Sequence, residues 1–133
     1  MNRDIKILYA EDDVEIRNEL LELLELDFSD IFVASNGEEG LALFEQHHPD
    51  IIITDIQMPK LDGITMCLQI HDQWHGVPTI LTTAFNEAHY RKQAEAMHET
   101  YFLSKPINMK DFYAAIEECV KEVNKKRGDI KDL

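Results

Sequence analysis

Five short runs of apolar residues recur along the chain, separated by longer segments in which apolar residues return every three or four positions. The runs lie at residues 5–10, 31–34, 51–54, 79–83 and 101–104. Because they are continuous rather than alternating, they are typical of strands covered on both faces, as in a parallel sheet. The pattern therefore predicts a doubly wound, three-layer α/β sandwich, in which right-handed crossovers place helices on both faces of one sheet.

The segments between the runs predict five helices. They are expected over residues 13–26, 35–47, 64–73, 86–98 and from 108 toward the end of the chain. Ser35, with Glu38 three residues later, fits a capping box, and Asn86 and Asn108 are suited to cap the last two helices. The final helix has an apolar stripe made of Phe112, Ile116, Cys119, Val120 and Val123.

The chain has 133 residues, which fits one domain, and no internal repeat or low-complexity segment interrupts it. Its last residues, KKRGDIKDL, are mostly polar. We expect a single domain over residues 1–126, followed over 127–133 by a frayed polar tail or the start of a linker.

Acidic residues outnumber basic ones by 26 to 13, which gives a net charge of −13. This charge disfavours direct binding to nucleic acid or to an anionic membrane surface, because both need a basic footprint. No apolar run approaches the ~20 residues of a membrane-spanning helix, and the start of the chain does not read as a signal peptide. We therefore expect a cytoplasmic protein.

The residue types that commonly bind transition metals are not arranged for that role. Cys67 and Cys119 share no metal-binding or redox spacing and are expected to be small core residues. The six histidines, at positions 47, 48, 71, 75, 89 and 98, show no such spacing either and are expected at the surface.

Polar side chains that could bind a metal ion or take part in a reaction follow or end four of the five predicted strands. They are Glu11, Asp12 and Asp13 after the first, Asp55 after the third, Thr82 and Thr83 at the fourth, and Lys105 after the fifth. In doubly wound folds, sites lie beyond the carboxyl ends of the strands. If the first and third strands are neighbours, Asp12 and Asp55 face each other, and such close carboxylates raise each other's pKa unless a cation lies between them. A few hard oxygen ligands suit Mg²⁺, whereas Asp13 is better explained by a helix N-terminus.

Four segments carry a resemblance to a known family. They are ILYAEDD, PDIIITDIQMPKLDG, PTILTTA and FLSKP, and they occur in this order between residues 5 and 106. Together they resemble the receiver domain of two-component response regulators, in particular the single-domain chemotaxis regulator, over about residues 5–125. The resemblance implies a flavodoxin-like fold with five parallel strands in the order 2-1-3-4-5 and five helices. It also implies a phosphoprotein of phosphorelay signal transduction.

The resemblance implies a role for each strand-end residue. Asp55 would accept a phosphoryl group from a histidine kinase or a histidine phosphotransfer protein, in a reaction that depends on Mg²⁺. The metal ligands would be Glu11, Asp12, Asp55 and the backbone carbonyl of Gln57. Such a domain catalyses only its own phosphorylation and dephosphorylation, so it is not an enzyme in the usual sense.

The remaining positions concern the response to phosphorylation. Thr83 would bind the phosphoryl oxygens, Lys105 would pair with them, and Phe102 would act with Thr83 as a switch that changes a partner-binding surface. Periodicity does not decide between Thr82 and Thr83, because only one of them can face the cleft; the resemblance selects Thr83. Phe102 has no hydroxyl, so it would respond by repacking alone, and a plain core role for it is equally open.

Three further positions depart from the family's pattern or modify it. Gln57 and Phe85 stand where this family modulates loss of the phosphate, and a bulky Phe85 predicts slow self-hydrolysis. His98 lies near a turn that often contains glycine, and a left-handed conformation there costs a non-glycine residue up to about 1 kcal/mol. The cognate kinase, the output domain or effector, and a dimer that forms on phosphorylation stay open.

Other functions fit these residues less well. An Mg²⁺-dependent aspartyl-phosphate phosphatase or phosphotransferase of the haloacid dehalogenase type needs a second aspartate two positions after the nucleophile, where this chain has Gln57. A flavin or nucleotide binder needs a phosphate-binding loop after the first strand, where EDDVEI offers carboxylates that repel phosphate. A receiver-like domain that is never phosphorylated is disfavoured, because every required residue is present.

Overall fold

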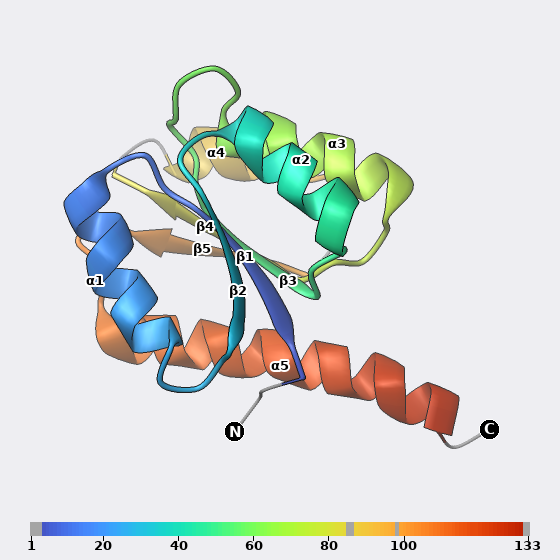
Figure 1. Ribbon diagram of the computed structural model, residues 1–133. Coiled ribbons are helices and arrows are strands. Elements are labelled where there is room, and N and C mark those ends of the chain that lie inside the picture. The colour runs from blue at the N-terminus through green and yellow to red at the C-terminus, as the bar shows by residue number, and fades with distance from the viewer. Residues whose placement is uncertain (1–3, 85–86, 98, 132–133) are drawn as a thin grey trace.

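The computed structural model describes residues 4–84, 87–97 and 99–131. Within them, one parallel sheet contains β1 (Lys6–Ala10), β2 (Asp30–Ala34), β3 (Ile51–Asp55), β4 (Thr79–Thr83) and β5 (Thr100–Ser104). The helices are α1 (Val14–Leu24), α2 (Gly37–His47), α3 (Gly63–Gln73), α4 (Glu87–Gln93) and α5 (Met109–Lys131). The strand order is β2-β1-β3-β4-β5. Helices α1 and α5 cover one face of the sheet, and α2, α3 and α4 cover the other (Figure 1). The predicted fold class and strand order are confirmed.

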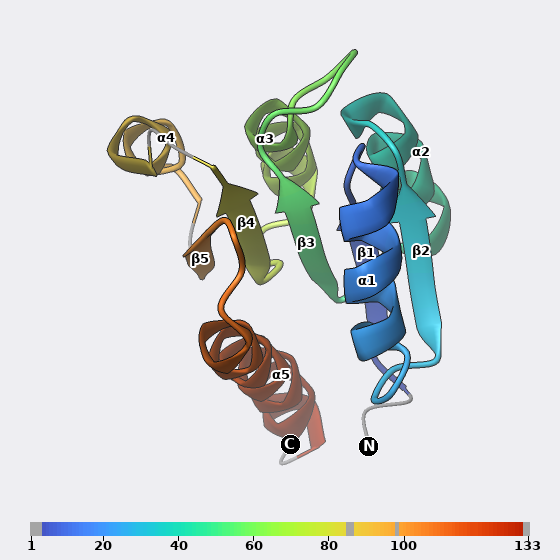
Figure 2. The ribbon, with the colours of Figure 1, turned by 90° about the vertical axis from the view of Figure 1, so that its left-hand side faces the viewer.

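Alternation along the strands divides the core into two layers. In β1, Ile7 and Tyr9 pack in the layer with α1 and α5, whereas Leu8 and Ala10 pack in the layer with α2 and α3. Every residue of β3 is buried, which explains why its sequence shows no polar alternation. The arrowheads of β2, β3 and β4 point to the same edge of the sheet (Figure 2). The loops that follow these strands therefore gather at that edge.

The helix caps agree with the sequence at one position and differ at another. Asn108 accepts a hydrogen bond from the Asp111 N–H at 3.1 Å, as expected for the start of α5. The expected cap of α2 at Ser35 is wrong by one residue. Asn36 is the cap and accepts from the Glu39 N–H at 2.9 Å, while the Glu39 carboxylate accepts from the Ser35 N–H at 3.1 Å. The Glu39 carboxylate thus bonds the N–H of the residue before the cap, whereas in a capping box it would bond the N–H of the cap itself.

Helix α4 is shorter than expected. It ends at Gln93 rather than near residue 98, and the N–H of Met97 then donates to the carbonyl of Ala94 in a turn. The residue with a left-handed backbone before β5 is Glu99, with a φ of 58°. The expected cap Asn86 and the expected strained residue His98 lie outside the described residues.

Helix α5 is longer than expected. It continues to Lys131, past the expected start of a polar tail at residue 127. Arg127 donates to the carboxylates of Asp4 and Asp50 at 2.7 and 3.2 Å, so this turn is tied to the amino ends of β1 and β3. The domain over residues 1–126 and the polar tail or start of a linker over 127–133 stay predictions. Among the described residues, no helix has the combined length and apolar character that crossing a membrane requires.

Single side chains also test the sequence interpretation. Cys67 and Cys119 are buried free cysteines, as expected. His71, expected at the surface, is 7% exposed. Its Nε2 lies 3.2 Å from the hydroxyl of Thr79, which donates its own proton to the carbonyl of Val77. Burial lowers the pKa of His71, so the ring acts as a neutral core residue between α3 and β4.

Gly63 joins the start of α3 closely to the end of β3. Its N–H donates to the carbonyl of Ile56 at 2.8 Å, and a Cβ at this position would collide with the carbonyl oxygen of Asp55. We expect Gly63→Ala to lower the free energy of unfolding by about 1–3 kcal/mol, because α3 must move away from β3. Urea denaturation followed by circular dichroism measures this change.

Gly128 provides the control for that substitution. It lies within α5, and nothing comes within 4 Å of a Cβ built on it. Alanine there should raise the free energy of unfolding by about 0.5–1 kcal/mol through better helix propensity. Equal effects of the two substitutions would contradict the close packing of α3 on β3.

Candidate functional site

Three strand ends bring charged residues together at one edge of the sheet. These residues are Glu11 and Asp12 after β1, Asp55 at the end of β3, and Lys105 after β5. β1 and β3 are hydrogen-bonded neighbours, with Ala10 beside Thr54. The next residue along each strand is a carboxylate, so the parallel register itself places Glu11 beside Asp55.

Glu11, Asp12 and Asp55 form a cluster of carboxylates. One oxygen from each of the three lies within 4.8 Å of those from the other two. Glu11 is 1% exposed and Asp55 is 7% exposed, whereas Asp12 is open to solvent. This donor set fits Mg²⁺, which is bound by few carboxylates and keeps several water molecules. The exposed side at Asp12 leaves room for that water.

The main chain that carries the acids is held by α1. Asp13 caps this helix, accepting from the Ile16 N–H at 3.0 Å, and its own N–H donates to the Glu11 carboxylate at 3.1 Å. The predicted helix N-terminal role of Asp13 is confirmed. Arg17 donates to the carbonyl of Glu11 at 2.9 Å. The sequence interpretation missed this contact, because a single arginine in the first turns of a helix carries no distinctive signal.

Lys105 supplies the positive charge of the site. Its ammonium nitrogen lies 3.0 Å from Asp55 Oδ2 and 3.1 Å from Glu11 Oε1, and its side chain is 18% exposed. The Lys105 N–H donates to the carbonyl of Thr83 at 2.8 Å, and the bond between Lys105 and Pro106 is cis. From its position directly after β5, the lysine therefore bridges the two buried carboxylates at the ends of β1 and β3.

Burial, neighbouring charges and hydrogen bonds together shift the pKa values of Glu11 and Lys105. Burial raises the pKa of Glu11 and the charge of Asp55 adds to this rise, while the Asp13 N–H and Lys105 partly offset it. Burial alone would lower the pKa of Lys105, but hydrogen bonds and charges from Asp55 and Glu11 outweigh it and raise this pKa. Lys105 thus stays an ammonium at neutral pH. Three carboxyl groups thus share one ammonium at this site.

Thr83 ends β4 and is 2% exposed. In the sheet register, however, the partner of Asp55 is Thr82. Because side chains alternate along a strand, Thr82 lies on the same face of the sheet as Asp55 and Thr83 on the opposite face. Both threonines are buried near the end of β3, and the assignment of the phosphoryl contact to Thr83 stays a prediction.

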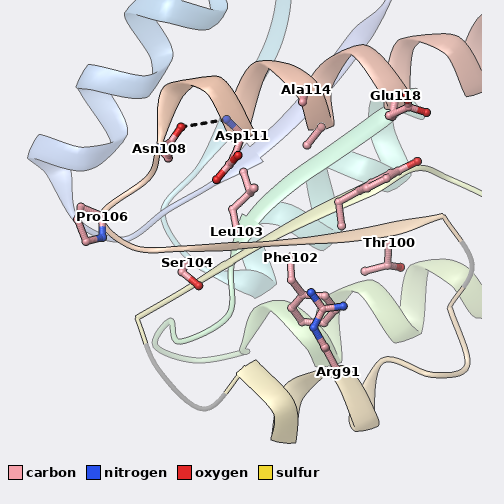
Figure 3. Close-up of a pocket in the computed structure, with 12 residues that line it drawn as sticks. Arg91, Thr100, Phe102, Leu103, Ser104, Pro106, Asn108, Asp111, Ala114 and Glu118 are labelled. Carbon is pink, nitrogen blue, oxygen red and sulfur yellow. Dashed lines mark hydrogen bonds between the residues drawn. The ribbon is translucent and has the colours of Figure 1, made fainter.

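Phe102 borders a groove of about 560 Å³ between α4, β5 and α5 (Figure 3). The guanidinium carbon of Arg91 lies 4.6 Å from the centre of the Phe102 ring, a cation–π contact. Asn108 and Asp111, joined by a hydrogen bond, lie at the start of α5 across the groove (Figure 3). Phe102 is half-buried, so both the switch role and the plain core role stay open.

Gln57 is exposed on the loop after β3, and its side chain is not free. Its Nε2 donates to the hydroxyl of Tyr90 at 3.1 Å. Sequence interpretation missed Tyr90, because no local pattern links two residues 33 positions apart. Phe85 lies outside the described residues, so the slow self-hydrolysis predicted from it stays a prediction.

Comparisons with known proteins identify relatives that match most of the chain. The family model for the response regulator receiver domain matches residues 7–117. A probable transcriptional regulator ycf27 of Guillardia theta is 35% identical over 120 residues, which are 90% of this chain and 47% of that protein. The transcriptional regulatory protein PdtaR of Mycobacterium tuberculosis is 32% identical over 132 residues, which are 96% of this chain and 64% of that protein. The chain spans about half the length of the ycf27 relatives that it matches.

Solved structures agree with the fold. The N-terminal domain of an uncharacterized protein (WS1339) from Wolinella succinogenes has a TM-score of 0.83 at 36% identity, covering 92% of this chain and 98% of that one. The chemotaxis response regulator CheY4 of Vibrio cholerae has a TM-score of 0.77 at 23% identity, covering 86% and 98% of the two chains. The second similarity concerns the fold alone.

Removing the ammonium of Lys105 tests whether it holds the buried carboxylates together. Without it, Glu11 and Asp55 lose their partner, and the folded protein is stabilised by keeping a proton on one of them. We expect Lys105→Met to lower the free energy of unfolding by about 1–3 kcal/mol at pH 8 in metal-free buffer. The loss should be smaller at pH 5. One of the two buried carboxylates of the folded variant can then take up a proton, and this removes part of the cost of leaving them without a partner. Urea denaturation at the two pH values measures the difference.

Lys121 on α5 is the matched control. Its side chain is 62% exposed and pairs with Glu117 and Glu118 at 3.9 and 3.5 Å. Exposed ion pairs contribute little, so Lys121→Met should change the free energy of unfolding by less than about 0.5 kcal/mol. Equal losses for the two lysines, or a loss at Lys105 that does not depend on pH, would contradict a buried charge network.

Proposed function

The chain belongs to the family of response regulator receiver domains, and from this premise we propose that Asp55 accepts a phosphoryl group from a histidine kinase or a histidine phosphotransfer protein. The observation that carries the proposal is the position of its carboxylate. At the carboxyl edge of the sheet it meets two other acids and the ammonium of Lys105. A nucleophile with an opposing cation and a cluster of oxygen ligands is the arrangement that phosphoryl transfer needs.

The reaction would begin with an oxygen of Asp55 attacking phosphorus in line with the bond to the donor's imidazole nitrogen. The new P–O bond forms as the P–N bond breaks, and the electron pair of that bond stays with the nitrogen, which leaves an acyl phosphate on Asp55. Lys105, 3.0 Å from Asp55, would move onto a phosphoryl oxygen and offset its charge.

We propose Mg²⁺ as the cofactor of this site. Glu11, Asp12, Asp55 and the backbone carbonyl of Gln57 would hold it, and when bound it would supply positive charge to the phosphoryl oxygens. Two arguments support this choice. The donors are hard oxygen atoms, and three carboxyl groups gather there around the single ammonium of Lys105, so a cation between them would relieve their mutual repulsion.

Phosphorylation would act by shifting a balance between two conformations. Because Thr83 lies on the face of the sheet opposite Asp55, its hydroxyl would have to move toward the strand end to donate a hydrogen bond to a phosphoryl oxygen. That movement would change the packing of Phe102 on the neighbouring strand β5. The groove between α4, β5 and α5 would then present a different surface to a partner. We propose that this surface binds a downstream effector, an output domain of a longer protein, or a second receiver domain. ycf27 and PdtaR are named as transcriptional regulators, which favours an output in gene regulation.

Catalysis on other substrates is the weaker alternative. A phosphatase or phosphotransferase would need an acid where Gln57 stands, and the Gln57 amide is bonded to Tyr90. We propose that the chain catalyses only its own phosphorylation and dephosphorylation, and that it works in the cytoplasm, where the catalytic domain of a partner kinase would reach it.

The direct test uses a small phosphodonor such as acetyl phosphate, with and without Mg²⁺, followed by intact-mass measurement. Wild-type protein should gain one phosphoryl group only when Mg²⁺ is present, because the carboxylates otherwise repel the incoming anion. Asp55→Asn should gain none. Asp72→Asn, which changes an exposed aspartate on α3, should behave as wild type. Uptake by Asp55→Asn equal to that of wild type would contradict the assignment.

A further inference from the structure

The side chain of Gln57 is tied to helix α4 across the loop that follows Asp55. Gln57 stands two residues after Asp55, and its Nε2 donates to the hydroxyl of Tyr90 at 3.1 Å. Tyr90 lies in the middle of α4. The bond therefore joins the loop that borders the carboxylate cluster to a separate helix on the far side of β4.

The position of the Tyr90 hydroxyl is set by the rest of α4 and by the core. Its ring packs against the apolar layer beneath α3 and α4, together with Met58 and Phe102. The ring of His89 lies edge-on to it, with 5.4 Å between the ring centres, and the Tyr90 carbonyl accepts from the Ala94 N–H at 3.0 Å. Gln57 has no comparable packing, since it is exposed. Tyr90 thus holds Gln57, rather than the reverse.

The hydrolysis of an acyl phosphate explains why holding this amide matters. A water oxygen attacks phosphorus in line, the bond between phosphorus and the Asp55 oxygen breaks, and its electron pair returns to the carboxylate. The proton of the water passes to solvent and inorganic phosphate leaves. The attacking water must approach from the side opposite Asp55, which is the open side of the site, where Asp12 and Gln57 are exposed. A free glutamine amide next to a phosphoryl group can orient such a water, as in GTPases.

We propose that Tyr90 is a positioning residue that prolongs the phosphorylated state, because it engages the Gln57 amide and keeps it from orienting the attacking water. The inference rests on the proposed function of Asp55. Loss of the hydroxyl would free the amide and speed hydrolysis, whereas an α4 that moves on phosphorylation would carry Tyr90 with it. The lifetime of the phosphate would then depend on the conformation of α4 and on whatever binds there.

The test is a double-mutant cycle on the hydrolysis rate. Protein is phosphorylated with acetyl phosphate and Mg²⁺, the donor is removed, and loss of the phosphoryl group is followed by intact mass. Tyr90→Phe keeps the ring and should shorten the phosphate half-life at least threefold. In the Gln57→Ala background, the same substitution should change the half-life by less than 1.5-fold. Tyr113→Phe, at a tyrosine of α5 that is 42% exposed, should leave it unchanged.

The outcomes separate this inference from the function on which it rests. A half-life unchanged by Tyr90→Phe overturns the role of Tyr90. So does an equal acceleration with and without Gln57, because that result shows a general loosening of α4 instead of an effect through the amide. If wild-type protein takes up no phosphoryl group on Asp55, the proposed function fails and the inference fails with it.

Discussion

The ion pairs that Lys105 makes with Asp55 and Glu11 are the interaction on which the site depends. A parallel sheet aligns the carboxyl ends of its strands, so the register of β1 and β3 forces two buried carboxylates together, and Asp12 adds a third. Such a group repels itself in a medium of low dielectric unless cations lie near it. Lys105 places one ammonium 3.0 Å from Asp55 and 3.1 Å from Glu11. The fold thereby gathers three carboxyl groups around a single ammonium at the carboxyl edge of the sheet.

Helix α4 connects this charged edge to the surface groove. Adjacent residues of the helix make the two contacts: Tyr90 accepts from Gln57 beside the site, and Arg91 lies over the ring of Phe102 on β5. With seven residues, α4 is too short to be stable alone, so these contacts and its packing decide where it lies. Helix α4 therefore contacts both the loop that follows Asp55 and the groove between α4, β5 and α5.

The sheet and the acidic edge could be predicted from sequence because both depend on short-range patterns. Continuous apolar runs locate the strands, and a charged residue at the end of a run has to lie at the edge. The cap of α2 was misplaced because Ser35 and Asn36 are both good caps with a glutamate three residues later. The end of α4 was missed because Ala94, Glu95 and Ala96 favour helix, and the turn depends on tertiary packing instead.

Inward-facing polar residues were harder to predict for the same reason. His71 was assigned to the surface because its partner Thr79 belongs to another element. The link between Gln57 and Tyr90 depends on where α4 lies over the sheet. Local sequence patterns do not contain that information. The polar residues at strand ends, by contrast, needed only the direction of the strands.

The most direct test of the account is the location of a bound divalent cation. Mn²⁺ uses the same oxygen ligands as Mg²⁺, and its unpaired electrons broaden nearby amide signals in NMR spectra. At low Mn²⁺ the account predicts that signals of residues 10–13 and 55–57 broaden first, and that Asp12→Asn removes this selectivity. Broadening that instead follows the exposed acids of α1, such as Glu15, Glu19 and Glu22, would show only general attraction to a chain of net charge −13. That result would contradict a single cation pocket at the strand ends.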